Sequence, residues 1–369
     1  MIKVLHILSD SNIGGAGTYV KTLIKNYDRT KFDLSVLVPR GSAVIRLLEG
    51  LDVNITEAEI TPDKSLDLRA VPILRRYIKQ SGCEIIHAHG CATARIAAKG
   101  ICKSVFTKHT LSVSGRGLRG AADRLSLIHI SEPTRPERIM YRLTGGYAIA
   151  VSKAAEQNLI NLGFNKKKIY TVLNGVADMQ IPSNEQKAAA KQSFGIDASK
   201  YVVGCVARFS PEKDHKTLLL AAQHVYERCD RLAFLLCGDG GMLNEMKTLA
   251  KQLGIYSKCV FTGNVYDICR AYHAMDLYCI TSLHESFGQS LAEAWSAGLA
   301  AVTSDAKGFT EISENNVTSV ICKRGDANAV AEAVLDLYNN REKAKRLAEN
   351  GRALYKAKYD SKVFARGIE

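Results

Sequence analysis

Short apolar runs recur along the first half of the chain, and the stretches between them carry apolar residues at helical spacing. The runs lie at residues 4–8, 34–38, 85–89, 104–107, 148–151 and 169–173. Strand-like runs that alternate with amphipathic helical stretches are typical of βαβ units. This half of the chain is therefore predicted to form a doubly wound parallel sheet.

The same pattern starts again after a polar stretch at residues 183–200. Its apolar runs lie at residues 202–207, 233–237, 259–262, 277–281, 301–303 and 319–321. A chain of 369 residues is long enough for two such domains. We predict an α/β fold of two Rossmann-like domains that face a central cleft, one over residues 1–178 and one over 179–369. The final helix is expected to cross back to the first domain and to be truncated by a few residues.

Composition and charge restrict the partners. The chain is 46% hydrophobic and 24% charged, which is ordinary for a globular protein, and its formal net charge is +13. This charge favours an anionic partner: nucleic acid, a nucleotide diphosphate, a lipid surface or an acidic polysaccharide. Nucleic acid is not expected, because the basic residues do not combine with aromatic residues into a reader motif.

The location predicted for the chain is cytoplasmic. The ten cysteines show neither C-x-x-C nor zinc-like spacing and are expected to be small buried residues in a reducing compartment. The start does not look like a signal peptide, and an apolar run of about 18 residues is absent from the sequence. Arg116, Arg119 and Arg124 could make peripheral contact with the anionic inner face of a membrane, but a solvated surface is the commoner fate of such residues.

Residues 125–136 interrupt an otherwise amphipathic helical pattern with two prolines. Their sequence resembles the translation of an adapter used to prepare DNA sequencing libraries. We expect this segment to be a sequencing or assembly artefact rather than a natural loop. No function is therefore assigned to His129, Glu132 or Arg135.

Two glutamates eight positions apart, Glu285 and Glu293, are the most informative candidates for chemistry. On one continuous helix they would lie about 12 Å apart along the axis. That separation suits a ligand that carries a ribose and a sugar at the two ends of a diphosphate. A surface helix with two solvated glutamates fits the spacing equally well.

A helix is predicted to begin inside this motif. Both Ser286-x-x-Gln289 and Ser290-x-x-Glu293 have the capping-box pattern, and the residues alone do not choose between them. In either case, backbone N–H groups at the helix start are expected to meet an anion. These N–H groups belong to Phe287, Gly288, Gln289 and Ser290.

The stretch Glu285-Ser-Phe-Gly, followed by Glu293-Ala and Gly298, resembles the E-x7-E signature of the retaining family 4 glycosyltransferases, which have the GT-B fold. The resemblance implies that Glu285 lies near the donor sugar and that Glu293 holds the ribose hydroxyls. The chain departs from the family pattern at Ala300, where proline is usual, and at Lys307-Gly308, where two glycines are usual.

A glycine-rich turn at residues 11–18 follows the first predicted strand and opens a helix. Glycine allows close backbone approach, and a helix start favours phosphate. The residues alone fit a packing turn or a dinucleotide site about as well. By resemblance to the family, Gly14 and Gly15 form the loop that reaches the donor diphosphate.

Two cationic residues follow the first predicted strand of the second domain. Arg208 ends the strand and Lys213 lies in the next turn, so both can point from the carboxyl edge where α/β sheets bind ligands. Two fixed cations can neutralise a diphosphate leaving group without a metal. A salt-bridged loop is the alternative, but the stretch resembles the family's G-R-x-x-x-x-K segment.

The remaining candidates come chiefly from the resemblance. His109 matches the family's histidine beside the donor sugar, Asn174 lies in a stretch like its interdomain approach, and Gly263 and Val265 lie in a segment like the one whose backbone reads the nucleobase. His87 and His89 alternate along a strand and could mimic a metal pair. A structural role is expected for these two, because no further ligand cluster is evident.

Together these residues predict a retaining, hexosyltransferase-like enzyme that moves a sugar from a nucleotide-diphosphate sugar to a glycan or a lipid-linked acceptor. Cell-surface polysaccharide synthesis is the expected setting, and neither a metal nor another cofactor is expected. A sugar-nucleotide epimerase of the same fold is one alternative. A non-catalytic GT-B-like binding subunit is the other.

Overall fold

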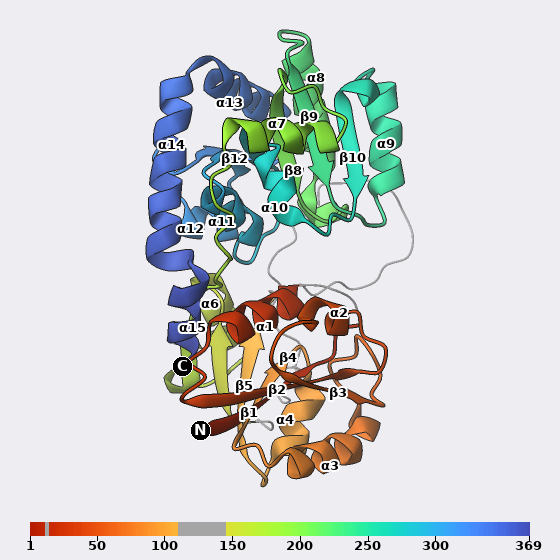
Figure 1. Ribbon diagram of the computed structural model, residues 1–369, viewed down its shortest axis with the longest axis vertical. Helices are drawn as coiled ribbons and strands as arrows, with labels where there is room; N and C mark the ends of the chain where they lie inside the picture. The colour runs from red at the N-terminus through yellow and green to blue at the C-terminus, as the bar shows by residue number, and fades with distance from the viewer. Residues whose placement is uncertain (12–14, 110–144) are drawn as a thin grey trace. The chain divides into compact units, whose positions relative to one another are not determined.

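The computed structural model describes residues 1–11, 15–109 and 145–369 (Figure 1). These residues form two compact units. Unit 1 is Met1–Asn174 with Phe364–Glu369, and unit 2 is Gly175–Val363. Five of the residues and ranges discussed above lie outside the described residues: Gly14, the three arginines Arg116, Arg119 and Arg124, and the whole segment 125–136.

Unit 1 is built on a sheet of seven parallel strands in the order β3-β2-β1-β4-β5-β6-β7. The strands are β1 (Ile2–Leu8), β2 (Phe32–Pro39), β3 (Asn54–Ala58), β4 (Ile85–His89), β5 (Lys103–Lys108), β6 (Tyr147–Ala150) and β7 (Ile169–Thr171). The apolar runs predict all of them except β3. That strand lies at the edge of the sheet and buries only Ala58, so it needs no apolar run.

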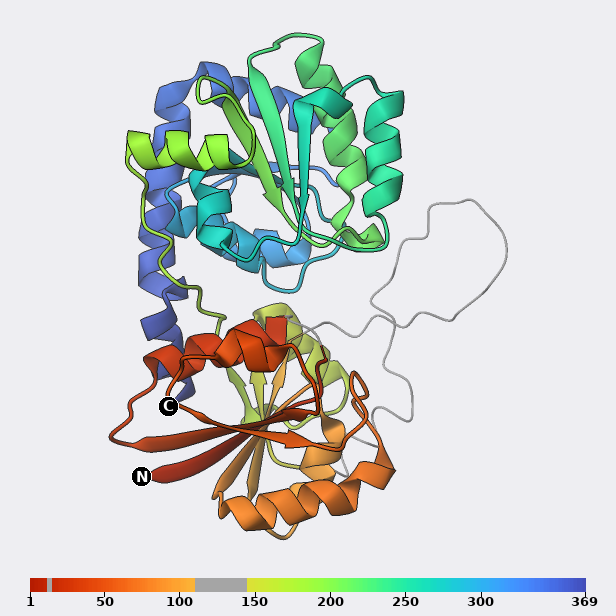
Figure 2. The ribbon, with the colours of Figure 1, turned by 45° about the vertical axis from the view of Figure 1, so that its right-hand side comes forward.

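Helices cover both faces of this sheet. Figures 1 and 2 show α1 (Gly15–Asn26) on one face, and α3 (Val71–Ser81) with α4 (Ala92–Ala98) on the other. Phe364 in α15 (Ser361–Ile368) packs edge-on against Tyr19 of α1, with ring centroids 4.7 Å apart. The other helical segments of the unit are α2 (Val44–Leu48), η1 (Leu68–Ala70), α6 (Lys153–Asn161) and η2 (Lys166–Lys168).

Unit 2 is built on six parallel strands in the order β10-β9-β8-β11-β12-β13, and each was predicted. They are β8 (Tyr201–Val206), β9 (Leu232–Cys237), β10 (Cys259–Gly263), β11 (Leu277–Ile280), β12 (Ala300–Ser304) and β13 (Val320–Cys322). The helical segments are α7 (Asn184–Ser193), η3 (Pro211–Lys213), α8 (His215–Tyr226), α9 (Leu243–Gln252), η4 (Tyr256–Lys258), α10 (Ile268–His273), α11 (Gln289–Ser296), α12 (Lys307–Ile312), α13 (Ala327–Asn339), α14 (Arg341–Leu354) and η5 (Tyr355–Tyr359).

The burial of the strands explains why the sequence predicts them. Every residue of β11 and β12 is buried, because parallel strands are covered on both faces and read as continuous apolar runs. The prediction of two doubly wound, Rossmann-like sheets is confirmed. In each sheet the strand order reverses once, between β1 and β4 and between β8 and β11. Open α/β sheets bind ligands beyond the carboxyl ends of the strands at such a point.

Most of the cysteines are buried, as predicted, and Cys102, Cys229 and Cys269 are half-buried. All ten cysteines are free thiols, and seven of them are buried. Among the helices of the described ranges, none combines the length and the apolar character needed to cross a membrane.

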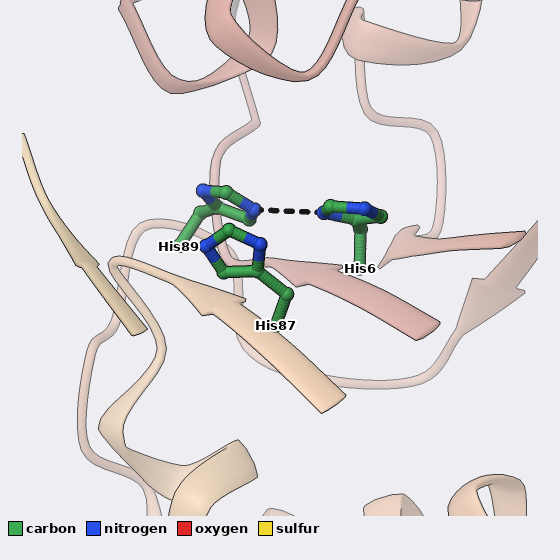
Figure 3. Close-up of side chains that lie close together, drawn as sticks. All are labelled: His6, His87 and His89. Atoms are coloured by element: carbon green, nitrogen blue, oxygen red, sulfur yellow. Dashed lines mark hydrogen bonds between the residues drawn. The ribbon is translucent and has the colours of Figure 1, made fainter. Parts of the chain in front are cut away.

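Three histidines lie side by side in unit 1 (Figure 3). His6 of β1 and His87 of β4 are register partners, and His89 follows on β4. Their exposed fractions are 1%, 3% and 0%. Burial lowers the pKa of His6 to about 4 and the pKa of His87 and His89 well below the usual value, because the charged ring loses its hydration. All three rings are therefore neutral at pH 7.

We predict that the protein loses stability as the pH falls from about 6.5 towards about 4. In this window the histidines of the unfolded chain bind protons while the buried rings do not, so acidification favours unfolding. Each such ring contributes at most about 1.4 kcal/mol per pH unit. Thermal melts across the window test this, and His87→Gln should show a weaker pH dependence than the unaltered protein. Equal dependences in the two proteins would contradict the prediction.

Candidate active site

The loops after β8 and β11 meet at the point where the strand order of unit 2 reverses. The backbone N–H of Leu283 donates to the carbonyl of Glu212 at 2.8 Å. The hydroxyl of Thr281 donates to the carbonyl of Asp214, also at 2.8 Å. These bonds tie the two loops together, so residues on one loop have fixed positions relative to residues on the other.

Lys213 and Glu285, one from each loop, form an ion pair. Lys213 Nζ donates to Glu285 Oε2 at 2.6 Å. The side chains are only 20% and 13% exposed, respectively, so water and salt screen this pair less than a surface pair. Two residues predicted from separate motifs are thus brought into contact. Arg208 is exposed just beyond the carboxyl end of β8, on the same loop as Lys213.

The helix begins inside this motif as predicted, but both predicted caps are wrong. Helix α11 begins at Gln289, its N-cap is Gly288, and no side chain caps it, so neither capping box forms. Gly288 turns the chain with a φ of 91°, a conformation that favours glycine. A Cβ at this position would also meet Phe309 Cδ1 at 2.9 Å.

This start also corrects the distance argument, because Glu285 lies in the loop before α11 and not on one continuous helix with Glu293. The N–H of Leu291 donates to the carbonyl of Gly288 at 3.0 Å, whereas those of Gln289 and Ser290 have no acceptor within the helix. These two amides follow Glu285 by four and five positions, and the anion site expected there stays a prediction.

Glu293 is held from two sides. Tyr272 Oη donates to Glu293 Oε2 at 2.7 Å, and Gln289 Nε2 donates to Glu293 Oε1 at 3.1 Å. Burial raises the pKa of Glu293, although these two bonds act in the opposite direction. A carboxylate has about four acceptor sites, so each oxygen retains a lone pair after these bonds. Glu293 is therefore oriented and can still accept further hydrogen bonds.

Sequence reasoning missed two tyrosines that support α11. Besides donating its one proton to Glu293, Tyr272 Oη lies 3.2 Å from the carbonyl oxygen of Ser290, and Tyr278 Oη donates to Ser290 Oγ at 2.7 Å. A buried tyrosine usually finds a partner for its hydroxyl, so the apolar surroundings of both residues were a signal. The sequence does not show which partner each tyrosine takes.

Gly308 supports the backbone of Glu285. Its N–H donates to the Glu285 carbonyl at 3.2 Å. A Cβ at position 308 would lie 2.8 Å from Glu285 C and 2.9 Å from Phe287 N. Position 308 therefore requires glycine, whereas the neighbouring Lys307 is exposed at the start of α12 and tolerates a side chain.

Backbone bonds join the carboxyl ends of β8, β9 and β10. Ala207 N donates to the carbonyl of Cys237 at 3.0 Å, and Gly238 N donates to the carbonyl of Gly263 at 2.9 Å. Gly263 has a φ of 67°, and Val265 beyond it is half-buried. The segment predicted to read a nucleobase is thus attached to the edge that carries Arg208.

Unit 1 holds the remaining candidates. Gly15 is exposed at the start of α1. The buried Oδ1 of Asn174 has no hydrogen-bond partner among the described residues. His109 follows β5, and its Nε2 lies 3.0 Å from His89 Nδ1.

His87 and His89 are buried and hydrogen-bonded within unit 1, and the structural role expected of them stays a prediction. His87 Nε2 lies 2.7 Å from Thr107 Oγ1, and His89 is bonded to His109 and to His6. The expectation that no ligand cluster surrounds these rings is wrong, because His6 brings three possible ligand atoms within 4.8 Å of one another. His6 is distant in sequence, and only the adjacency of β1 and β4 places it there.

We predict that Gly308→Ala destabilises the protein by about 1–3 kcal/mol, because the added methyl group must displace the Glu285 backbone. Gly241→Ala is the matched control, since a Cβ there has no neighbour within 4 Å among the described residues. Chemical denaturation of both variants measures the difference. Equal stabilities would show that the loop yields without strain.

Two family models match the chain. Residues 13–178 match a model described as Glycosyltransferase Family 4, and residues 186–354 match one described as Glycosyl transferases group 1. Together the two matches account for most of both units.

Known proteins show the same likeness. The chain is 28% identical to the glycosyltransferase candidate EpsF of Bacillus subtilis (strain 168) over 314 residues, which is 82% of this chain and 79% of that protein. It is 26% identical to the N-acetyl-alpha-D-glucosaminyl L-malate synthase of Bacillus anthracis over 206 residues, 55% and 54% of the two chains. The crystal structure of Anabaena HepE in complex with UDP-glucose has a similar fold, with a TM-score of 0.81 at 21% identity, covering 100% of this chain and 98% of HepE. The chain thus consists of a glycosyltransferase family 4 domain followed by a glycosyl transferases group 1 domain, and it is a glycosyltransferase of the GT-B fold.

Proposed function

We propose that this glycosyltransferase moves a sugar from a nucleotide-diphosphate sugar to a glycan or a lipid-linked acceptor in cell-surface polysaccharide synthesis, with retention of configuration. The observation that carries the proposal is the Lys213–Glu285 pair, which joins a cation and a carboxylate beyond the carboxyl ends of β8 and β11. HepE, which shares the fold, binds UDP-glucose, and this supports a donor of the same class.

Lys213, Arg208 and the first amides of α11 would bind the donor diphosphate. Departure of the nucleotide leaves negative charge on the phosphate, and fixed cations and N–H groups stabilise that charge as it develops. Lys213 has three N–H donors, so it can keep Glu285 as a partner while it binds phosphate oxygens. This arrangement needs no metal, and we propose that none takes part.

Glu285 would orient the donor sugar, and Glu293 would accept hydrogen bonds from the ribose hydroxyls. The second carboxyl oxygen of Glu285 accepts from the N–H of Ser286 at 3.3 Å, which together with Lys213 fixes the carboxylate plane. Glu293 is held by Tyr272 and Gln289 and retains lone pairs for the ribose.

The transfer would occur on the front face of the sugar. The bond between the anomeric carbon and the phosphate oxygen breaks, and the acceptor oxygen forms its bond to the same carbon. The departing phosphate takes the proton of the acceptor hydroxyl. Gly15, Asn174 and His109 would contribute donor contacts from unit 1, with Gly263 and Val265 meeting the base through their backbone.

We predict that Lys213→Met loses the affinity for nucleoside diphosphates. A ligand at about 100 times its dissociation constant stabilises a folded protein by about 2.7 kcal/mol, which a thermal shift detects. One of the UDP, GDP and ADP sugars should therefore raise the melting midpoint of the unaltered protein. None of them should raise the melting midpoint of Lys213→Met. The exposed Lys216 provides the control Lys216→Met, which should respond like the unaltered protein. A normal shift in Lys213→Met would refute the assignment.

We predict that Glu285→Gln lowers kcat for sugar transfer by at least about 100-fold, because it removes a charge placed at the reacting sugar. Release of nucleoside diphosphate, measured with and without an acceptor extract, reports the turnover. An altered sugar nucleotide formed from the donor alone would identify an epimerase instead. Near-normal transfer by a folded Glu285→Gln would remove this residue from the mechanism.

A further inference from the structure

Arg324 reaches the loop that carries Glu285 from the edge of the unit 2 sheet. It follows β13, the edge strand, and its Nη1 donates to the carbonyl oxygen of Leu283 at 3.2 Å. Strand β12 lies between β13 and β11, so the two outer strands are about 10 Å apart. One side chain thus connects the loop after β13 with the loop after β11.

Asp305, which follows β12, holds Arg324 in place. Its Oδ1 accepts from the backbone N–H of Arg324 at 3.0 Å and from Nε at 2.8 Å. The two side chains are 43% and 41% exposed, and a pair as exposed as this adds little to stability. Its consequence is geometric: the N–H groups of a guanidinium have a fixed planar arrangement, so the contact at Nε restricts the direction of Nη1.

The bond to Leu283 acts on the peptide group that precedes Glu285. This group joins Leu283 to His284, and in a planar trans peptide the C=O and the N–H point in opposite directions. The C=O accepts from Arg324, and the N–H, which belongs to His284, donates to the carbonyl of Glu212 at 3.4 Å. The peptide plane is therefore held at two opposite edges, and its orientation determines where the backbone of Glu285 begins.

The bonds on either side of this plane come from groups that face the core. Ser304 Oγ, in the buried strand β12, donates to the carbonyl of Ser282 at 2.5 Å. The N–H of the buried Gly308 donates to the carbonyl of Glu285. Arg324 is the exposed member of this series. Replacing its side chain therefore releases one edge of the plane and leaves the core bonds in place.

We propose that Arg324 is a positioning residue that acts through the Leu283 carbonyl. It fixes the backbone before Glu285 and thereby places the carboxylate that pairs with Lys213. The use of that carboxylate at the donor sugar rests on the proposed function. The restraint on the loop rests only on contacts within unit 2.

Direct attraction of an anionic donor is the competing role for an exposed arginine. Lysine separates the two roles, because it retains the positive charge but lacks the planar set of donors that lets Arg324 bind Asp305 and Leu283 together. If charge alone matters, Arg324→Lys behaves like the unaltered protein. If the peptide plane must be held, Arg324→Lys behaves like Arg324→Met.

The first test is hydrogen exchange in the full-length protein, followed by mass spectrometry of peptides that cover residues 281–288. We expect the amides of Leu283 and His284 to exchange faster in Arg324→Met and Arg324→Lys, because their bonds to Glu212 open more often. The control Lys323→Met removes the neighbouring exposed cation and should leave this exchange unchanged. Thermal melts verify that the variants are folded.

Kinetics provide the second test. Arg324→Met and Arg324→Lys should each lower kcat for sugar transfer by about 10- to 100-fold with little change in the KM for the donor, because a small displacement of a group at the reacting sugar has effects of this size. Lys323→Met should transfer sugar normally. In a Glu285→Gln background, Arg324→Met should have little further effect, since the two changes act through the same carboxylate.

Four outcomes would overturn the proposal. They are unchanged exchange at residues 283 and 284 in Arg324→Met, a normal kcat in that variant, full activity in Arg324→Lys, and an undiminished effect of Arg324→Met in the Glu285→Gln background. If exchange increases as expected but Glu285→Gln transfers sugar normally, the restraint on the loop stands and the proposed function fails.

Discussion

The backbone bonds that tie the loop after β8 to the loop after β11 are the constraint on which the site depends. Each loop alone would carry one charged residue at an undefined place. The carbonyls of Glu212 and Asp214 bind groups of the β11 loop, and this brings Lys213 within 2.6 Å of Glu285. A cation and a carboxylate held in this way keep their geometry without a ligand, so little reorganisation is needed when a ligand binds.

The sequence was sufficient for the architecture because buried parallel strands read as uninterrupted apolar runs. It failed at β3, where an edge strand needs no such run, and at the cap of α11. There, two serines suggested caps, but Gly288 is the N-cap, and Phe309 leaves no room for a side chain at that position. Steric contacts between distant segments decide such details, and local sequence does not encode them.

For the candidate residues too, the sequence indicates which residues matter, and the fold decides which of them are in contact. Glu285 and Lys213 could be named because the stretches that contain them resemble the motifs of a known family. Their contact, and the support of Glu293 by Tyr272, depend on which strands are neighbours. His6 could not be linked to the other histidines for the same reason, because β1 and β4 are adjacent in the sheet but about 80 residues apart in the chain.

The contrast between positions 307 and 308 has a consequence for how such enzymes can diversify. Glycine at 308 is tied to the protein's own backbone, so it is indispensable whatever ligand is used. The exposed Lys307 makes no such backbone contact. It lies at the amino end of α12, next to Gly308, whose N–H donates to the Glu285 carbonyl. A side chain at 307 can therefore change without moving the Glu285 backbone, so this position is open to variation and its neighbour is closed to it.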